Sequence, residues 1–182
     1  MSDSIDLNQL QDRAAALVEA ARRAGADSSD AVVATSRSTG VDVLDGKVEE
    51  SEGAENNAFS LRVFVGQSSA SVSANMTGDL TQLAERAVAM AKVSPEDPHA
   101  GLAAEGRLAT RIADLDLMDD TQLVFTEMRE RAVACEEAAL AVNGVTKSSG
   151  SSFGQTLGGT VLATSHGFVG SYGASRFSLS TS

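Results

Sequence analysis

The sequence predicts an α+β protein, in which an antiparallel or mixed β-meander is covered by helices and followed by the start of a second α+β domain. Three observations favour this class. Residues 39–75 contain strand-forming runs separated by turn residues, the flanking segments repeat apolar residues at helical spacing, and strand formers return after residue 145. Apolar residues recur every second position in half-buried strands and every third or fourth in helices, so the period distinguishes the elements.

The meander is organised by two predicted turns. Asp45-Gly46 suits a hairpin loop of two residues, because both central positions need positive φ and these residue types tolerate it. Gly66-Gln67 permits a second tight turn. Residues 59–65 alternate between an apolar and a mixed face, as in a half-buried strand, and residues 31–35 form an expected buried strand that leads into the meander.

Two helices are predicted on either side of the meander. Asp6 and Asp79 stand at N-cap positions, each with glutamine three residues later in the capping-box spacing. Gly25 is a left-handed terminator of the first helix, and Ser94-Pro95 ends the second, because the residue before proline avoids helical backbone. The predicted apolar faces are Leu7, Leu10, Ala14, Leu17, Val18 and Ala21, and Leu80, Leu83, Ala84, Ala87, Val88 and Ala91.

The second half of the chain contains a third predicted helix and further strands. The helix is expected to begin at Asp119 and to end at Asn143-Gly144. Residues 160–164 and 168–172 carry β formers, with a turn at residues 165–167. The predicted apolar face of the helix is Val124, Met128, Ala132, Cys135, Ala139 and Val142.

Composition indicates where the domains divide. We expect an N-terminal α+β domain at residues 1–94, a linker at residues 95–106 that holds both prolines, and the start of a central α+β domain at residues 107–182. The alternation at Phe177 and Leu179 continues to the last residue without a cap or breaker. We therefore expect the chain to be cut within a strand, as a fragment of a longer protein.

Charge and composition exclude several classes of partner. The net charge is −11 and no Lys/Arg cluster exists, so we expect neither direct nucleic-acid binding nor attraction to anionic membranes. No segment approaches the roughly 20 apolar residues of a membrane span. The single cysteine favours a reducing compartment, and the N-terminus lacks a secretory pattern, so we expect a cytoplasmic protein.

One catalytic motif occurs, at residues 150–154, which match G-x-S-x-G with Ser152 as the nucleophile. That mechanism needs a helix after the serine, whereas the following residues predict a strand, and His166 has no evident acidic partner. We therefore interpret the match as chance in a Ser/Gly-rich segment.

The remaining candidates have simple structural interpretations. His99 lies in an acidic loop and is expected to be solvated, since a zinc site needs four ligands. His166 is interpreted as a turn residue that tolerates positive φ, and Cys135 as a small packed hydrophobe. The Asn75 glycosylation sequon has no meaning without a secretory signal, and the acidic residues 49–55 form a solvated hairpin edge or a partner-facing loop. No catalytic, cofactor-binding or metal residue is therefore assigned.

Ordered motifs along nearly the whole chain resemble a known family. They are Ala24-Gly25-Ala26-Asp27, Val48-Glu49, Leu61-Arg62-Val63-Phe64-Val65-Gly66, Ser94-Pro95-Glu96-Asp97-Pro98, Ala100-Gly101-Leu102-Ala103, Leu115-Asp116-Leu117, Glu136-Glu137-Ala138-Ala139-Leu140 and Ser165-His166-Gly167-Phe168-Val169-Gly170-Ser171-Tyr172. In this order they resemble the N-terminal part of the PmbA/TldD family, and the PmbA (TldE) branch most closely.

The resemblance implies a function that the residues alone do not. TldD- and TldE-like proteins form a heterodimeric, cytoplasmic zinc metalloprotease that acts on unfolded or extended peptides. The zinc ligands belong to the TldD-like partner, in a later part of the chain, so this chain is expected to carry no cofactor and to be the non-catalytic subunit. Family members are also described as modulators of DNA gyrase, which leaves a regulatory binding module as the alternative.

The resemblance also implies chains much longer than this one. The strand at residues 177–181 would then have an exposed edge. We expect self-association through this C-terminal edge, because unpaired backbone groups seek a partner strand.

Overall fold

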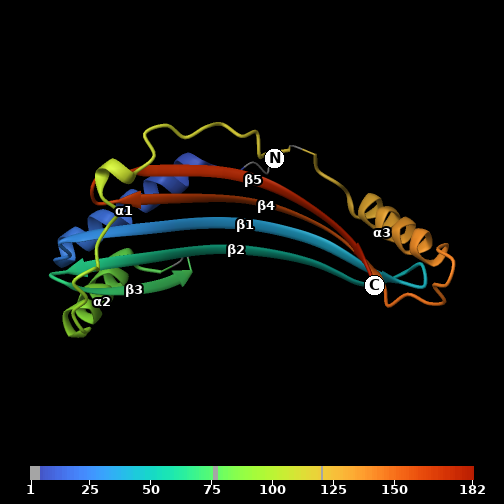
Figure 1. The fold of residues 1–182 in the computed structure, drawn as a ribbon, viewed down its shortest axis with the longest axis horizontal. Coiled ribbons are helices and arrows are strands. Elements are labelled where there is room, and N and C mark those ends of the chain that lie inside the picture. Colours follow the sequence, from blue (N-terminus) through green and yellow to red (C-terminus); the bar gives the residue numbers. More distant parts are fainter. Residues whose placement is uncertain (1–4, 76–77, 120) are drawn as a thin grey trace. The chain divides into compact units, whose positions relative to one another are not determined.

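The computed structural model describes residues 5–75, 78–119 and 121–182. Five strands form one antiparallel sheet in the order β3-β2-β1-β4-β5 (Figure 1). The α+β class is confirmed, and the sheet is antiparallel rather than mixed. The elements are α1 (Leu7–Ala24), β1 (Ser28–Leu44), β2 (Lys47–Val65), β3 (Ser68–Asn75), α2 (Leu80–Val93), η1 (Glu105–Arg107), α3 (Phe125–Leu140), β4 (Ser151–Thr164) and β5 (Val169–Thr181).

Both predicted turns of the meander are present. Asp45 and Gly46 adopt φ of 50° and 70° between β1 and β2, and Gly66 adopts 58° between β2 and β3. The second hairpin pairs Val65 with Ser68 and continues to Ala58 opposite Asn75. Positive φ at these positions matches the right-handed twist of the strands, so the local sequence is sufficient to place the turns.

β1 is longer than the sequence predicts. It runs without interruption from Ser28 to Leu44, so the expected strand at residues 31–35 and the start of the meander are one element. Residues 35–39 are mostly small and polar, and none of them is fully buried. Apolar alternation is therefore lost there, while the backbone pairing of a strand continues because it does not depend on the side chains.

The described chain forms two compact units, each built from three stretches. The first comprises residues 1–35, 57–115 and 159–173, and the second comprises residues 36–56, 116–158 and 174–182. β1, β2, β4 and β5 each supply residues to both units. The sequence-based division into residues 1–94, 95–106 and 107–182 stays a prediction.

The first unit has its core between two helices and one face of its strands. The N-caps at Asp6 and Asp79 are confirmed, since their side chains accept N–H groups of the first helical turn. Gly25 ends α1 with φ of 97°, and Ser94 is the C-cap of α2. The buried core residues are Leu10, Ala14, Leu17, Ala21, Ala31, Val33, Phe59, Leu61, Val63, Val72, Ala84, Ala87, Val88, Ala91, Val161 and Ala163.

The second unit has a smaller core beneath α3. Val41, Val43 and Phe153 of the strands pack against Met128 and Ala132 of the helix. Of the residues predicted to form the apolar face of this helix, only Met128 and Ala132 are buried, so the rest of the prediction is wrong. Val124 and Val142 are exposed, Cys135 and Ala139 are half-buried, and Glu136 is buried instead.

The third helix begins at Phe125 rather than at Asp119. The Asp119 carboxylate accepts the Thr121 N–H at 2.8 Å, which makes a tight turn instead of a helix cap. The buried Gln155 amide then accepts the Leu123 N–H and donates to the Thr121 carbonyl. The hydrogen bonds from Gln155 to the backbone of Thr121 and Leu123 take the place of helical hydrogen bonds, so α3 begins only at Phe125.

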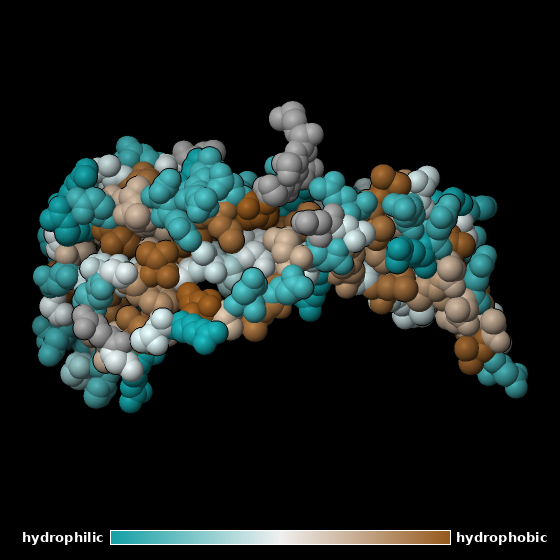
Figure 2. Space-filling view, turned by 90° about the horizontal axis from the view of Figure 1, so that it is seen from above, coloured by the Kyte–Doolittle hydropathy of each residue, from teal (hydrophilic) through white to brown (hydrophobic). Residues whose placement is uncertain are grey.

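Hydrophilic side chains cover much of the face in Figure 2, and smaller hydrophobic areas lie between them. Among residues 5–75, 78–119 and 121–182, no helix combines the length and hydropathy that crossing a lipid bilayer requires.

Candidate functional site

The second unit places a buried carboxylate against the tip of the β1–β2 hairpin. Glu136 is 1% exposed on α3. Its Oε2 accepts the Gly46 N–H at 2.9 Å and its Oε1 accepts the Asp45 N–H at 3.2 Å. Both donors belong to the turn, so one side chain of α3 holds the turn through its backbone.

These contacts keep the Glu136 carboxyl ionised. The Gly46 N–H makes the largest contribution to lowering its pKa, and Ser148 and the Asp45 N–H act in the same direction, while burial opposes them. A charged carboxylate is the stronger acceptor for the two turn amides. Glu136 therefore has a structural role that accounts for its burial.

Glu136→Gln is expected to destabilise the protein at pH 7 and to have less effect at pH 3. Because the folded pKa is lowered, the carboxylate stabilises the fold above its ordinary pKa, and this contribution is lost as the pH falls through the folded pKa. Urea unfolding of both proteins at each pH measures the difference. The exposed neighbour provides the control Glu137→Gln, and an equal effect of the two substitutions at pH 7 would contradict the role of Glu136.

A hollow of about 370 Å³ lies in the same unit. It combines carboxylates with serine hydroxyls and contains no lysine, arginine or histidine. Such a lining can accept and donate hydrogen bonds, but it lacks the imidazole or amine that typically activates a serine or threonine nucleophile. The lining residues are Asp42, Val43, Glu49, Glu50, Ser149, Gly150, Ser151, Ser152, Ser180, Thr181 and Ser182.

Ser152 lies in β4, so the G-x-S-x-G match has no nucleophile elbow. The segment continues as a strand to Thr164 instead of turning into a helix. Its neighbour Ser151 is buried and donates its hydroxyl to the Ser180 carbonyl at 2.8 Å. Both histidines belong to the first unit, so the described part of the second unit supplies no imidazole.

Neither histidine lines this hollow, and nor does the asparagine of the glycosylation sequon. His99 is exposed in a loop, where its backbone N–H donates to the Asp97 carboxylate at 2.8 Å. His166 is exposed in the predicted turn, and the positive φ of this turn is adopted by Gly167, at 87°, rather than by His166. The sequon beginning at Asn75 continues into residues 76–77, which lie outside the described residues.

The acidic residues 49–55 form part of β2 rather than a loop, and all are exposed. Glu55 pairs with Arg37 at 2.8 Å. Within the described ranges, no three or more His, Cys, Asp or Glu side chains come together as a metal site. No step through zinc is assigned to these residues.

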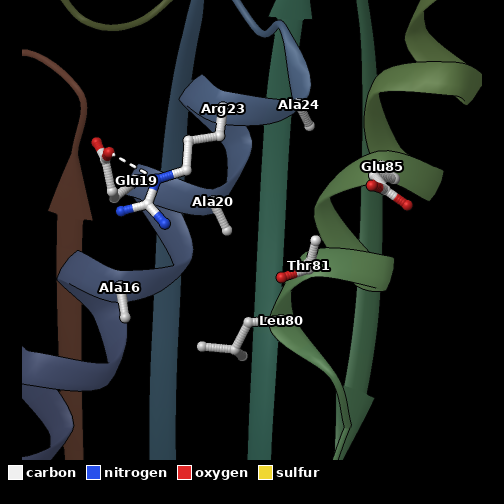
Figure 3. A pocket seen from close by; sticks show the side chains of 8 residues that line it. All are labelled: Ala16, Glu19, Ala20, Arg23, Ala24, Leu80, Thr81 and Glu85. Atoms are coloured by element: carbon white, nitrogen blue, oxygen red, sulfur yellow. Dashed lines mark hydrogen bonds and ion pairs between the residues drawn. The ribbon is translucent and has the colours of Figure 1, made fainter.

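The first unit has a groove of about 280 Å³ between α1 and α2 (Figure 3). Alanines of α1 and Leu80 of α2 form much of its lining, with Glu19, Arg23 and Glu85 among the charged residues. The lining residues are Ala16, Glu19, Ala20, Arg23, Ala24, Leu80, Thr81 and Glu85.

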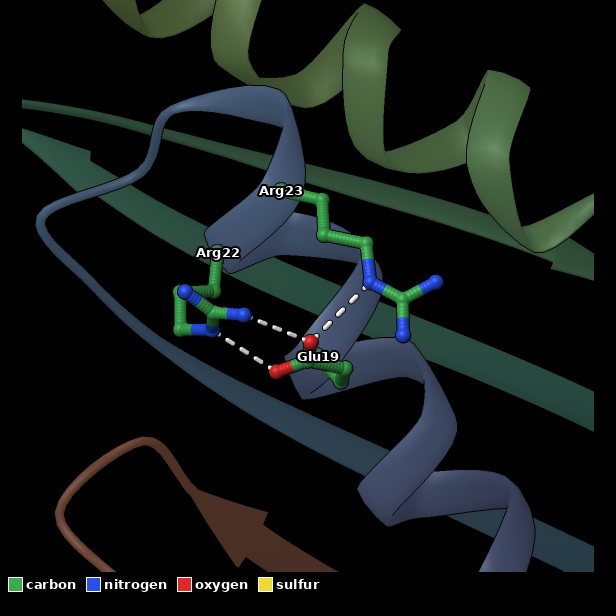
Figure 4. A network of polar contacts seen from close by, with 3 residues as sticks. All are labelled: Glu19, Arg22 and Arg23. Atoms are coloured by element: carbon green, nitrogen blue, oxygen red, sulfur yellow. Dashed lines mark hydrogen bonds and ion pairs between the residues drawn. The ribbon is translucent and has the colours of Figure 1, made fainter.

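Glu19 forms a surface network with two arginines of α1 (Figure 4). Arg22 binds it through Nε and Nη2, at 2.8 and 2.7 Å, and Arg23 binds it through Nε at 3.0 Å. Hydrogen bonds from Arg22 and then Arg23 lower the pKa of Glu19 from 4.5 to about 2. The network stabilises the helix above pH 4.5 and loses this effect as the pH falls toward 2, although solvent screens the exposed charges.

Comparison with known proteins identifies the family. Residues 29–91 match the family model described as PmbA/TldA metallopeptidase domain 1. The chain is 34% identical over 171 residues to a metalloprotease PmbA homolog of Haemophilus influenzae, and 32% identical over 163 residues to metalloprotease PmbA of Escherichia coli O157:H7. These alignments cover 91% and 87% of this chain. The chain belongs to the PmbA/TldD family.

Solved structures of other proteins show the same fold. A proposed modulator of DNA gyrase from Bacteroides thetaiotaomicron has a TM-score of 0.84 at 22% identity, over 94% of this chain and 40% of its own. TldE from Thermococcus kodakarensis has a TM-score of 0.73 at 14% identity, over 92% of this chain and 38% of its own. The chain spans only 37% and 36% of the two curated relatives.

Proposed function

We propose that this chain is the N-terminal part of the non-catalytic, TldE-like subunit of a heterodimeric zinc metalloprotease, which acts in the cytoplasm on unfolded or extended peptides. The observation that carries the proposal is the 34% identity with a PmbA metalloprotease homolog over 91% of this chain. Both curated relatives are PmbA proteins, which favours the TldE-like branch and therefore a zinc site on a TldD-like partner.

The polar contacts described here suit a scaffold. Glu136 holds a hairpin turn, Gln155 holds an extended segment, and Asp30 accepts Arg62 at 2.9 Å. Each of these groups is satisfied by a neighbour on the same unit, so its chemistry is accounted for by stability. The contribution to proteolysis is then to support the subunit pair and the shape of the peptide-binding chamber.

Co-expression with the metal-containing homologue tests this function. We expect the two chains to co-purify and to cleave an unfolded peptide only together. A partner with its metal ligands replaced is the control, and it should bind this chain without cleavage. Cleavage by this chain alone, or stoichiometric zinc on the purified chain, would contradict the assignment of zinc to the partner. Loss of such activity in Ser152→Ala would instead favour a serine hydrolase.

A regulatory binding module is the second candidate, because two of the structures of similar fold are of proposed DNA gyrase modulators. Under this alternative the chain would change the rate of gyrase supercoiling without peptide cleavage. A supercoiling assay with the purified chain, and with a heat-denatured sample as the control, separates the alternatives. An unchanged rate would count against the modulator function.

A further inference from the structure

Two turns of the second unit each contain an acid or amide side chain followed by glycine. Asp45-Gly46 joins β1 to β2, and Asn143-Gly144 follows α3. Both glycines have positive φ, 70° at Gly46 and 98° at Gly144. The residues before them are both exposed, and no other Asp-Gly or Asn-Gly pair occurs in the sequence. The two turns therefore form a matched pair, and the difference between them lies in their hydrogen bonds.

The two glycine N–H groups differ in their partners. The Gly46 N–H donates to the Glu136 Oε2 at 2.9 Å. In the other turn, the Val145 N–H donates to the Val142 carbonyl at 3.0 Å and closes the turn. Within the part of the chain that the structure describes, no oxygen accepts a hydrogen bond from the Gly144 N–H. The nitrogen of Gly144 is therefore available for reaction, whereas a carboxylate holds that of Gly46.

An available glycine nitrogen after asparagine permits a reaction with water alone. The Gly144 nitrogen loses its proton and attacks Cγ of Asn143, a nitrogen–carbon bond forms, and the side-chain nitrogen leaves as ammonia, which takes up the proton. Water then opens the cyclic imide at either carbonyl and gives aspartate or isoaspartate. Glycine favours the attack because it has no Cβ to obstruct the approach. The overall reaction consumes water and releases ammonia, so it requires no oxidant.

Glu136 opposes the corresponding reaction at Asp45-Gly46, in which water leaves instead of ammonia. Loss of the Gly46 proton would place a negative nitrogen beside the Glu136 carboxylate, and like charges oppose ionisation. The attack would also break a charge-assisted hydrogen bond. Because the pKa of Glu136 is lowered, chiefly by the Gly46 N–H, the carboxylate is a weak base for removing this proton.

We propose that Asn143-Gly144 is a site of spontaneous deamidation and isoaspartate formation, and that Glu136 protects the Asp45-Gly46 turn from the equivalent change. The product adds a negative charge just beyond Ala141, the C-cap of α3, where the helix dipole disfavours anions. Isoaspartate also lengthens the main chain between α3 and β4. The modification therefore loosens the end of the helix that carries Glu136, and it does not depend on the proposed role in proteolysis.

Incubation of the purified 182-residue chain at mildly alkaline pH, in water labelled with heavy oxygen, tests the site. Peptide mapping by mass spectrometry should find aspartate and isoaspartate at residue 143, each carrying the label. Gly144→Ala should slow the reaction at least about tenfold, because the added Cβ obstructs the attack. An Asn143 that stays unchanged, or that reacts equally fast in a folded Gly144→Ala chain, would overturn the proposal.

A single variant compares the two turns directly. Asp45→Asn makes both turns Asn-Gly, and asparagine suits the hairpin because it tolerates positive φ. In the folded chain residue 143 should deamidate at least about tenfold faster than residue 45, since attack at residue 45 must break a charge-assisted hydrogen bond. In urea the two rates should become similar, because only the local sequence then acts. Similar rates in the folded chain, or an undiminished difference in urea, would overturn the protection.

Glu136→Ala, added to Asp45→Asn, should raise the rate at residue 45 toward that at residue 143, because it removes the acceptor of the Gly46 N–H. Glu137→Ala is the matched control, since Glu137 is the exposed neighbour on α3, and it should leave the rate unchanged. A folded Glu136→Ala chain whose rate at residue 45 does not rise would contradict the role of Glu136. If circular dichroism shows that this chain is unfolded, the comparison within Asp45→Asn decides.

Discussion

Phe59→Ala should lower the free energy of unfolding by about 3–5 kcal/mol, since removing a buried aromatic ring loses its transfer energy and leaves a cavity. Phe59 is 1% exposed in β2 and belongs to the core that α1 and α2 form with the sheet. The first unit contains few other aromatic side chains in this core, so the surrounding alanines and valines cannot fill the space. Urea unfolding monitored by circular dichroism gives the change.

Phe125→Ala is the matched control. Phe125 is 47% exposed at the first position of α3, where alanine is a good helix former. Its effect should stay within about 0.5 kcal/mol, as for surface substitutions in general. Equal losses for the two phenylalanines would show that Phe59 is not a core residue.

Gly150→Ala should cost about 2–4 kcal/mol, because backbone strain and overpacking act together. Gly150 has φ of 117°, and a Cβ at this position would stand 2.9 Å from the Val43 carbonyl oxygen. A backbone oxygen within a sheet cannot move aside as a side chain can. Thermal and urea unfolding measure the loss, and hydrogen exchange at the start of β4 locates it.

Gly144→Ala separates the contribution of backbone strain from that of overpacking. Gly144 has φ of 98°, but a Cβ there would meet nothing within 4 Å. It should therefore show the conformational strain alone, about 1–2 kcal/mol. If Gly150→Ala costs no more than Gly144→Ala, the close approach to Val43 makes no contribution to stability.

The third helix shows why part of the fold could not be predicted. Asp119 has the sequence of an N-cap, and as a local signal it is as good as Asp6 or Asp79. The outcome differs because Gln155, distant in sequence, bonds to the backbone of residues 121 and 123. A capping pattern is a local property, and it does not reveal a competing partner from another strand.

The burial of Glu136 could be predicted from the sequence only in part. It lies four residues after Ala132 and eight after Met128, which is the spacing of one helix face. A carboxylate at a position where the helical period predicts an apolar residue therefore indicates a buried hydrogen-bond acceptor. The predicted apolar face included Cys135 at this turn of the helix and not Glu136. The donors to Glu136 are amides of a turn about 90 residues earlier, and only the folded chain brings them together.

By itself, the sequence determined the α+β class, the caps of α1 and α2, the hairpin turns at Asp45-Gly46 and Gly66, and the ordered motifs of the PmbA/TldD family. These depend on backbone φ preferences, short hydrogen bonds and apolar period, which act within a few residues. Tertiary structure alone decided the length of β1, the start of α3 and the burial of Glu136. Each of these depends on which distant segment supplies, or does not supply, the hydrogen-bond partner.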